Sequence, residues 1–289
     1  MDNSRMVIRP PSEAGSFLLP VTFGCSHNKC AFCATYRDEI FRLKDQRIIE
    51  KDLEFAARYC QRQKRVFLAD GDVLSLPQRK LIEIFTLIRA RLPWVNRISL
   101  YGNAKNILRK SEQELKQLKD LGLSRVFMGL ESGHNPTLLA INKGADSAQM
   151  IKAGKLIRAA GLFLSVTVLL GVAGRKNSEA HARATGQVIS AMSPNQVGVL
   201  TLMLLPGTPL YEQAEKGEFV MPDQAGFLRE LYLIVENIEL ERLQFQSNHA
   251  SNYLPINCRL PRDRQPVLSA IAKALNGEIT LKPEHLRAL

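Results

Sequence analysis

Short apolar runs alternate with segments of helical periodicity along the chain. The apolar runs, each long enough for a buried strand, lie at residues 16–23, 65–69, 97–101, 125–128, 162–170 and 197–203. Apolar positions recur at helical spacing in the segments that follow them, at residues 50–63, 81–92, 111–122, 148–160, 178–192 and 224–237. Strands without polar alternation are typical of a parallel sheet covered by helices, so the pattern predicts an α/β fold.

The strand and helix order predicts a partial (β/α)6 barrel. The first strand lacks the GxGxxG turn of a dinucleotide-binding fold. We expect an N-terminal segment at residues 1–15, the core barrel at 16–240 and a short C-terminal extension at 241–289 that closes the barrel mouth. One helix start is marked by Ser111 and Glu114, which form a capping-box pattern.

Three cysteines, Cys25, Cys30 and Cys33, lie within nine residues after the first predicted strand. Closely spaced thiolates are typical of iron–sulfur clusters or zinc. Structural zinc and electron-transfer clusters usually have a fourth protein ligand, whereas three cysteines leave one iron of a four-iron cluster open. Two alternatives stay open on the loop alone: a zinc site with His27 as fourth ligand, and three thiols without a shared role.

Composition narrows the class of protein. Five cysteines, three of them clustered, argue against a secreted disulfide framework. No apolar run approaches the length of a membrane span and no signal pattern opens the chain, so we expect a soluble cytoplasmic protein without a membrane partner. The net charge of +11 favours anionic partners. Because the basic residues are spread along the chain, a generally basic enzyme is favoured over a nucleic-acid binder.

The strand ends carry the remaining candidates, since barrel enzymes place their chemistry there. The second predicted strand ends in Asp70-Gly71-Asp72 and the third in Tyr101-Gly102-Asn103, both of which also suit ordinary turns. The fourth ends in Gly129-Leu130-Glu131-Ser132, where a carboxylate after an apolar run is poorly explained as a surface charge. The fifth and sixth end in two further segments, Gly171 to Arg175 and Pro206-Gly207-Thr208-Pro209.

The strand, the cysteine loop and Phe32 before the last cysteine together resemble the opening of the radical S-adenosylmethionine (radical SAM) superfamily. The commonest spacing in that superfamily has three residues between the first two cysteines, and this chain has four. The Gly-Leu-Glu-Ser and Pro-Gly-Thr-Pro segments resemble the subgroup of oxygen-independent coproporphyrinogen oxidases and RNA methylthiotransferases. The resemblance covers roughly residues 16–240 and implies the same partial barrel.

The resemblance also implies a cofactor and a reaction. Cys25, Cys30 and Cys33 would hold a [4Fe–4S] cluster whose open iron chelates SAM, which is cleaved to a 5′-deoxyadenosyl radical that abstracts a substrate hydrogen. A reducing partner such as flavodoxin or ferredoxin would supply the electron, and the substrate would be a small molecule or an anionic one such as nucleic acid. The expected SAM contacts are Phe32, Asp70, Gly71, Asp72, Glu131, Ser132, Gly171 and Arg175.

Residues 243–253 form an alternating strand that runs into a polar cluster. Hydroxyl, amide and imidazole groups beside an apolar barrel suit a polar substrate, although they also suit a surface turn. We expect His249 and Cys258 to act in catalysis, Cys258 as a hydrogen-atom donor. The expected substrate contacts are Tyr101, Asn103, Ser247, Asn248 and Asn252.

Two function classes rival the radical enzyme. One is a zinc-stabilised nucleic-acid-binding protein, and the other is a non-catalytic iron–sulfur sensor or electron carrier.

Overall fold

The computed structural model describes residues 8–37 and 39–288. The chain forms two compact units, each assembled from several segments. The first comprises Met1–Asn28, Thr35–Met128 and Leu156–Leu164, and the second comprises Lys29–Ala34, Gly129–Lys155 and Ser165–Leu289. The boundary between the units therefore divides the cysteine loop, with Cys25 in the first unit and the other two cysteines in the second.

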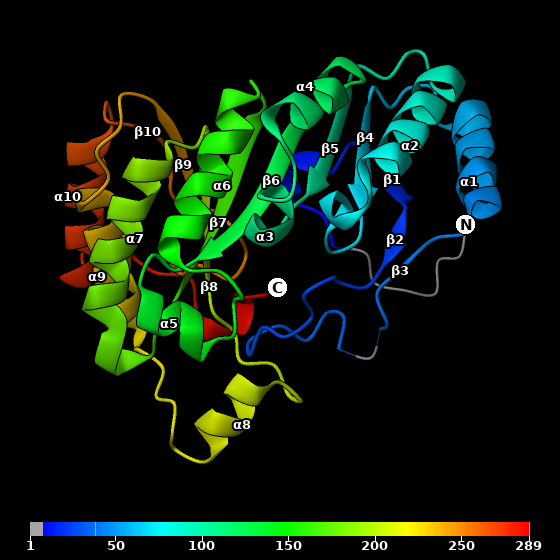
Figure 1. The fold of residues 1–289 in the computed structure, drawn as a ribbon. Helices are drawn as coiled ribbons and strands as arrows, with labels where there is room; N and C mark the ends of the chain where they lie inside the picture. The colour runs from blue at the N-terminus through cyan, green and yellow to red at the C-terminus, as the bar shows by residue number, and fades with distance from the viewer. Residues whose placement is uncertain (1–7, 38, 289) are drawn as a thin grey trace. The chain divides into compact units, whose positions relative to one another are not determined.

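The first unit is built on parallel strands. β1 (Phe17–Pro20), β4 (Arg65–Ala69), β5 (Arg97–Tyr101) and β6 (Leu123–Glu131) are paired in that order, and β6 belongs to this unit as far as Met128. α1 (Gln46–Tyr59) and α2 (Gln78–Arg91) lie side by side, and α3 (Ala104–Ile107) and α4 (Glu112–Asp120) follow β5 (Figure 1). A separate antiparallel pair consists of β2 (Thr22–Phe23) and β3 (Arg42–Leu43).

The second unit continues the α/β pattern. β7 (Phe163–Leu170), β8 (Gln196–Thr201) and β9 (Leu243–Gln246) are parallel, whereas β10 (Asn257–Leu260) is antiparallel to β9. Three long helices lie side by side in Figure 1: α7 (Ser178–Met192), α9 (Gln224–Glu236) and α10 (Arg264–Leu275). The remaining helices are α5 (Asn135–Ala140), α6 (Ser147–Ala159) and α8 (Pro209–Glu215).

The sheet order β1-β4-β5-β6-β7-β8-β9-β10 confirms the predicted α/β class with a mostly parallel sheet. Each predicted strand and helix has an observed counterpart. The predicted first strand is divided into β1 and β2, because proline at position 20 cannot donate a ladder hydrogen bond and the chain then pairs with β3. The predicted capping box is present: Ser111 Oγ accepts from Glu114 N, and Glu114 Oε2 accepts from Ser111 N.

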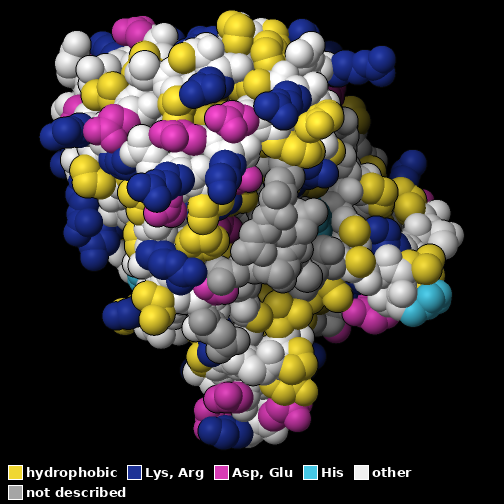
Figure 2. Space-filling view, turned by 90° about the vertical axis from the view of Figure 1, so that its right-hand side faces the viewer, with side chains coloured by type: hydrophobic (Ala, Val, Ile, Leu, Met, Phe, Trp, Pro, Cys, Tyr) yellow, Lys and Arg dark blue, Asp and Glu magenta, His cyan; other side chains and the backbone are white. Residues whose placement is uncertain are grey.

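The described surface is basic but mixed in charge. In Figure 2, Lys and Arg side chains are interspersed with Asp and Glu. On α1 and α2, Arg79 and Lys80 pair with Glu83, and Arg91 with Glu54. Within the described residues, none of the helices combines the length and the apolar character that a membrane crossing requires.

Candidate active site

In the first unit, the cysteine loop lies directly against the end of β4. The N–H of Gly71 donates to the carbonyl of Gly24 at 3.1 Å. A Cβ on residue 71 would lie 2.7 Å from the Cβ of Cys25, so only glycine permits this approach. The neighbouring Asp70 has a φ of 78°, a left-handed conformation that is uncommon outside glycine. The predicted Asp-Gly-Asp segment and the first cysteine are therefore in contact.

Asp72 ties the cysteine loop to the end of β5. Its side chain is fully buried, and its Oδ2 accepts hydrogen bonds from Ser26 Oγ at 2.7 Å and from the amides of Asn103 and Asn106, both at 2.5 Å. Burial raises the pKa of Asp72, and the hydrogen bonds from Ser26, Asn106 and Asn103 act in the opposite direction. The network fixes Ser26, the residue after Cys25. Asn106 was missed by the sequence analysis.

Two of the predicted substrate residues lie in this unit, and both make contacts within the protein. Asn103 caps α3, because its Oδ1 accepts from the backbone N of Asn106 at 2.9 Å. The Tyr101 ring packs on Phe67 and Phe127, with ring centroids 5.0 and 6.1 Å away. Burial raises the pKa of Tyr101, and the charge of Glu13 adds to the shift. A substrate contact by either residue stays a prediction.

In the second unit, Ala31 anchors the part of the loop that carries Cys30 and Cys33. Its N–H donates to the carbonyl of Ile141 at 2.9 Å, and its carbonyl accepts from the N–H of Leu210 at 3.0 Å. Its side chain belongs to a buried apolar cluster against which Phe32 also packs. The backbone between the two cysteines is thus fixed while their side chains stay partly exposed.

The donor chemistry of the loop fits an iron–sulfur cluster. Cys25, Cys30 and Cys33 are cysteines with partial exposure, so a metal can reach their sulfur atoms. Among the described residues, no three His, Cys, Asp or Glu side chains are already grouped as a metal site. The fit therefore rests on the three soft donors within nine residues, which suit iron–sulfur ligation with one position left for an external ligand.

Glu131 occupies a strained turn at the end of β6. Its φ is 62°, and the N–H of Ser132 donates across it to the carbonyl of Leu130 at 2.8 Å. Its Oε1 accepts from Lys143 Nζ at 2.9 Å, and both side chains are largely buried. Strained conformations cost on the order of 1–3 kcal/mol each and concentrate at functional sites. A SAM contact by this carboxylate stays a prediction.

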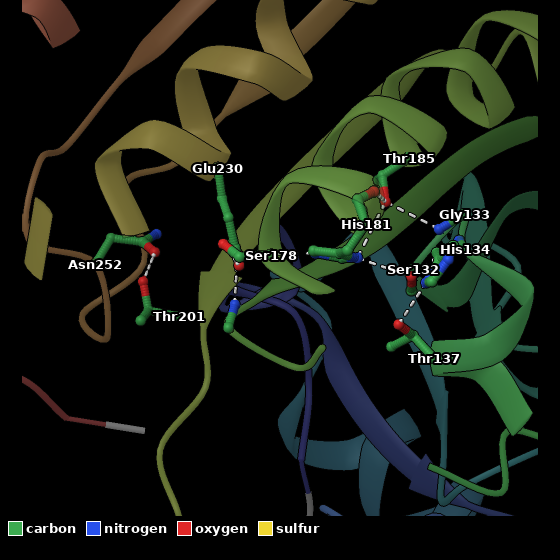
Figure 3. Close-up of polar contacts among 11 residues, drawn as sticks. Ser132, Gly133, His134, Thr137, Ser178, His181, Thr185, Thr201, Glu230 and Asn252 are labelled. Carbon is green, nitrogen blue, oxygen red and sulfur yellow. Dashed lines mark hydrogen bonds and ion pairs between the residues drawn. The ribbon is translucent and has the colours of Figure 1, made fainter. Parts of the chain in front are cut away.

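A buried polar network lies behind the ends of β6 and β7 (Figure 3). Ser132 Oγ is 2.7 Å from His181 Nδ1, and Glu230 accepts from the N–H of Gly171 through Oε2 and from Ser178 Oγ through Oε1, both at 2.6 Å. His181 Nε2 is buried without a hydrogen-bond partner among the residues that the structure describes, and it lies 3.8 Å from Glu230 Oε2. Two predicted SAM residues are thus hydrogen-bonded to these helices, Ser132 to His181 of α7 and Gly171 to Glu230 of α9.

Burial sets the charge of this network. It raises the pKa of Glu230 from 4.5 to about 7. Burial, together with the neighbouring His134, lowers the pKa of His181 from 6.5 to about 3, so the imidazole is neutral at physiological pH. Sequence reasoning missed both residues. The sequence pattern that could have identified them is an ionisable side chain among the apolar positions of a helix, His181 in α7 and Glu230 in α9. Such groups are rarely buried without partners.

These shifts predict opposing pH dependences of stability. The folded state binds the Glu230 proton more tightly than the unfolded chain, so stability falls as pH rises from about 4.5 to about 7. The unfolded chain binds the His181 proton more tightly, so stability rises between about pH 3 and 6.5. Glu230→Gln should remove the fall and keep the contacts, because an amide can accept from Gly171 and donate to Ser178. Between pH 4.5 and 7, the free energy of unfolding of Glu230→Gln, measured by urea unfolding, should therefore rise more steeply with pH than that of the native protein.

The control for this prediction is Glu236→Gln, which removes a carboxylate from the exposed side of the same helix. Its pH profile should follow that of the native protein. Parallel profiles for the native protein and Glu230→Gln would contradict the assignment of the buried proton to Glu230.

Most of the other predicted residues of this unit contact protein groups. Gly171 has a φ of 80° and packs on Phe227, where a Cβ would lie 2.3 Å from the ring. Arg175 is exposed, and its N–H donates to the carbonyl of Val220 at 2.7 Å. Asn252 holds a loop to β8, donating to the carbonyl of Val199 at 2.7 Å and accepting from Thr201 Oγ1 at 2.8 Å (Figure 3).

The last predicted residues differ widely in exposure. Asn248 is exposed, and His249 is half-buried with Nδ1 2.9 Å from Ser251 Oγ. Ser247 is fully buried, and its Oγ has no hydrogen-bond partner among the described residues. Cys258 is buried on β10 opposite Phe245. Burial and the charge of Asp263 raise the pKa of Cys258 to about 11, so this sulfur is a neutral thiol.

Residues 19–185 match the family model described as the Radical SAM superfamily. The match covers more than half of the chain, and the chain belongs to the radical SAM superfamily. Members of this superfamily are enzymes that use a [4Fe–4S] cluster and SAM. The resemblance drawn from the cysteine loop and the strand ends is therefore confirmed.

Relatives and structural neighbours agree with this family. An uncharacterized protein of Methanocaldococcus jannaschii is 27% identical over 266 residues, which cover 86% of this chain and 76% of that protein. The bacteriochlorophyllide d C-8(2)-methyltransferase of Chlorobaculum tepidum is 26% identical over 252 residues, which cover 82% of this chain and 52% of that enzyme.

Among solved structures, the radical SAM enzyme coproporphyrinogen III oxidase from Escherichia coli matches with a TM-score of 0.56 and 15% identity. The match covers 76% of this chain and 51% of that chain. The chain thus spans about half the length of the methyltransferase and of the oxidase. At this identity the structural likeness shows the fold alone.

Proposed function

We propose that this protein is a radical SAM enzyme that cleaves SAM reductively and removes a hydrogen atom from a substrate. The observation that carries the proposal is the loop of Cys25, Cys30 and Cys33 within the region that matches the superfamily. When bound, the cluster and SAM supply the electron transfer and the 5′-deoxyadenosyl radical. A reductant such as flavodoxin or ferredoxin provides the electron, and the cytoplasm, where free thiols persist, is the expected compartment.

The chain's own residues bind and orient these groups. The three thiolates hold the cluster, and Gly71 and Asp72 fix the backbone beside Cys25. Glu131 and the backbone at Gly171 receive SAM, with Phe32, Asp70, Ser132 and Arg175 as further expected contacts. At the substrate end, His249 and Cys258 act in catalysis. The expected substrate contacts are Tyr101, Asn103, Ser247, Asn248 and Asn252.

Anaerobic reconstitution tests the proposal. The reconstituted protein should be brown, contain about four irons per chain, change its spectrum on addition of SAM and form 5′-deoxyadenosine after reduction. A colourless protein with one zinc would instead support a zinc-stabilised nucleic-acid-binding role. A cluster that is indifferent to SAM would support a sensor or electron carrier.

Glu131→Gln is expected to weaken SAM binding while leaving the cluster in place. A lost charged hydrogen bond costs on the order of 1.5–3 kcal/mol, which raises the dissociation constant at least about tenfold. Titration of the reconstituted variant with SAM measures the change. Glu236→Gln, an exposed carboxylate on α9, serves as the matched control. Equal SAM affinity for the native protein and Glu131→Gln would remove Glu131 from the site.

A further inference from the structure

A polar pocket with a volume of about 270 Å³ opens in the first unit beside the start of the cysteine loop. Its lining includes Ser26 and His27, the two residues that follow Cys25, and three residues that follow β5: Lys105, Asn106 and Arg109. Among the described residues, the lining includes a lysine, an arginine and a histidine but no aspartate or glutamate. The pocket therefore offers positive charge next to the first cysteine.

Lys105 and Arg109 bring two basic side chains to the lining of the same pocket. Lys105 lies in α3 and Arg109 in the turn that follows this helix, and both side chains are exposed to solvent. Neither of them forms an ion pair with any Asp or Glu in the part of the chain that the structure describes. An anion in the pocket would neutralise both at once.

A hydrogen bond to Asn106 orients the exposed side chain of Arg109. Its Nη1 donates to Asn106 Oδ1 at 3.2 Å, and the Asn106 amide donates in turn to Asp72 Oδ2 at 2.5 Å. The Asp72 carboxylate also accepts from Ser26 Oγ and from the Asn103 amide, so it is hydrogen-bonded to three residues that line the pocket while its own side chain is buried. Guanidinium groups with a fixed orientation are suited to bidentate recognition of phosphate and carboxylate.

We propose that this pocket binds the anionic end of the substrate, a phosphate monoester or a carboxylate. Its volume is below the roughly 300–1,000 Å³ of a complete small-ligand site, so it takes a charged group and leaves the rest of the molecule outside. A group held by Arg109 and Lys105 lies against Ser26 and His27, which directly follow a cluster cysteine. The assignment to substrate rests on the proposed function, whereas anion binding itself does not.

Anion binding is tested on the protein without its cluster. Thermal unfolding is followed while inorganic phosphate and, separately, acetate are titrated at constant ionic strength, because a ligand of the folded state raises the unfolding temperature saturably. Saturable stabilisation by phosphate, by acetate or by both supports the proposal and identifies the anion. Arg109→Gln and Lys105→Gln should each weaken this binding about tenfold, as expected for one lost charged hydrogen bond.

Arg58→Gln, which removes an exposed charge near the end of α1, is the matched control and should bind the anion as the native protein does. The assignment of an anion site to this pocket is overturned if phosphate and acetate do not stabilise the native protein, if their effect does not saturate, or if it is equal in the native protein and all variants. A loss of SAM affinity in reconstituted Arg109→Gln would assign the pocket to the SAM carboxylate and overturn the substrate assignment. Failure to form 5′-deoxyadenosine would overturn the proposed function alone, since anion binding is measured without cluster or SAM.

Discussion

Replacing Cys25, Cys30 or Cys33 by alanine is expected to abolish loading of the iron–sulfur cluster. Each substitution leaves two thiolates in the loop, too few to retain a four-iron cluster whose fourth iron has no protein ligand. Iron and sulfide content after anaerobic reconstitution should fall from about four irons per chain to fewer than about one. The expected loss is the same for all three cysteines, because each would hold one iron.

The chain provides two matched controls for this experiment. Cys60 lies at the end of α1 and Cys258 on β10, both outside the loop. Cys60→Ala and Cys258→Ala should keep the full iron content. His27→Ala should keep it as well, which separates this site from zinc held by three cysteines and His27. Undiminished iron in any one of the three loop variants would remove that cysteine from the ligand set.

Asp72→Asn is expected to destabilise the protein and to impair cluster loading. If the new amide keeps its oxygen at the position of Oδ2, its NH2 group replaces Oδ1 and faces the backbone N–H of Asn103, which donates to Oδ1 at 3.3 Å in the native protein. In the other orientation the NH2 group faces the amide donors of Asn103 and Asn106. Neither neighbour can turn its amide without loss, because Asn103 Oδ1 caps α3 and Asn106 Oδ1 accepts from Arg109. Buried groups without partners cost about 1–3 kcal/mol each, so the expected loss is on the order of 3 kcal/mol.

Urea unfolding of the cluster-free protein measures this loss, and iron content after reconstitution measures its effect on the loop. Asp120→Asn, an exposed carboxylate at the end of α4, should change the free energy of unfolding by less than about 0.5 kcal/mol. A similarly small change for Asp72→Asn would show that this network does not support the cysteine loop. The variant also tests SAM binding by Asp72, a contact that stays a prediction.

Several short elements were absent from the sequence prediction. α3, α5 and α8 have four to seven residues, which give too few turns for a hydrophobic period to be recognised. In contrast, α10 could have been predicted from the sequence, because its buried apolar residues recur at helical spacing. These residues are Val267, Leu268, Ile271 and Ala274. β10 has four residues, and its pairing with β9 makes it a strand.

The contacts that define the site join residues far apart in the sequence. Asp72 is 34 residues from Asn106, and Ser132 is 49 residues from His181. The approach of Gly71 to Cys25 likewise depends on how β4 meets the cysteine loop. No local pattern encodes such pairs, because they exist only once the strands have paired and the helices have packed.

The sequence by itself determined the α/β class, the order of the long elements, the capping box at Ser111 and the cysteine motif. Each of these depends on residues within one or two turns or along one strand, where periodicity and spacing act directly. The tertiary structure alone decided that Asp72 binds the cysteine loop, that Glu131 pairs with Lys143 and that His181 and Glu230 are buried behind the strand ends. Burial and distant partners set the charge and position of these groups, and only the folded chain supplies both.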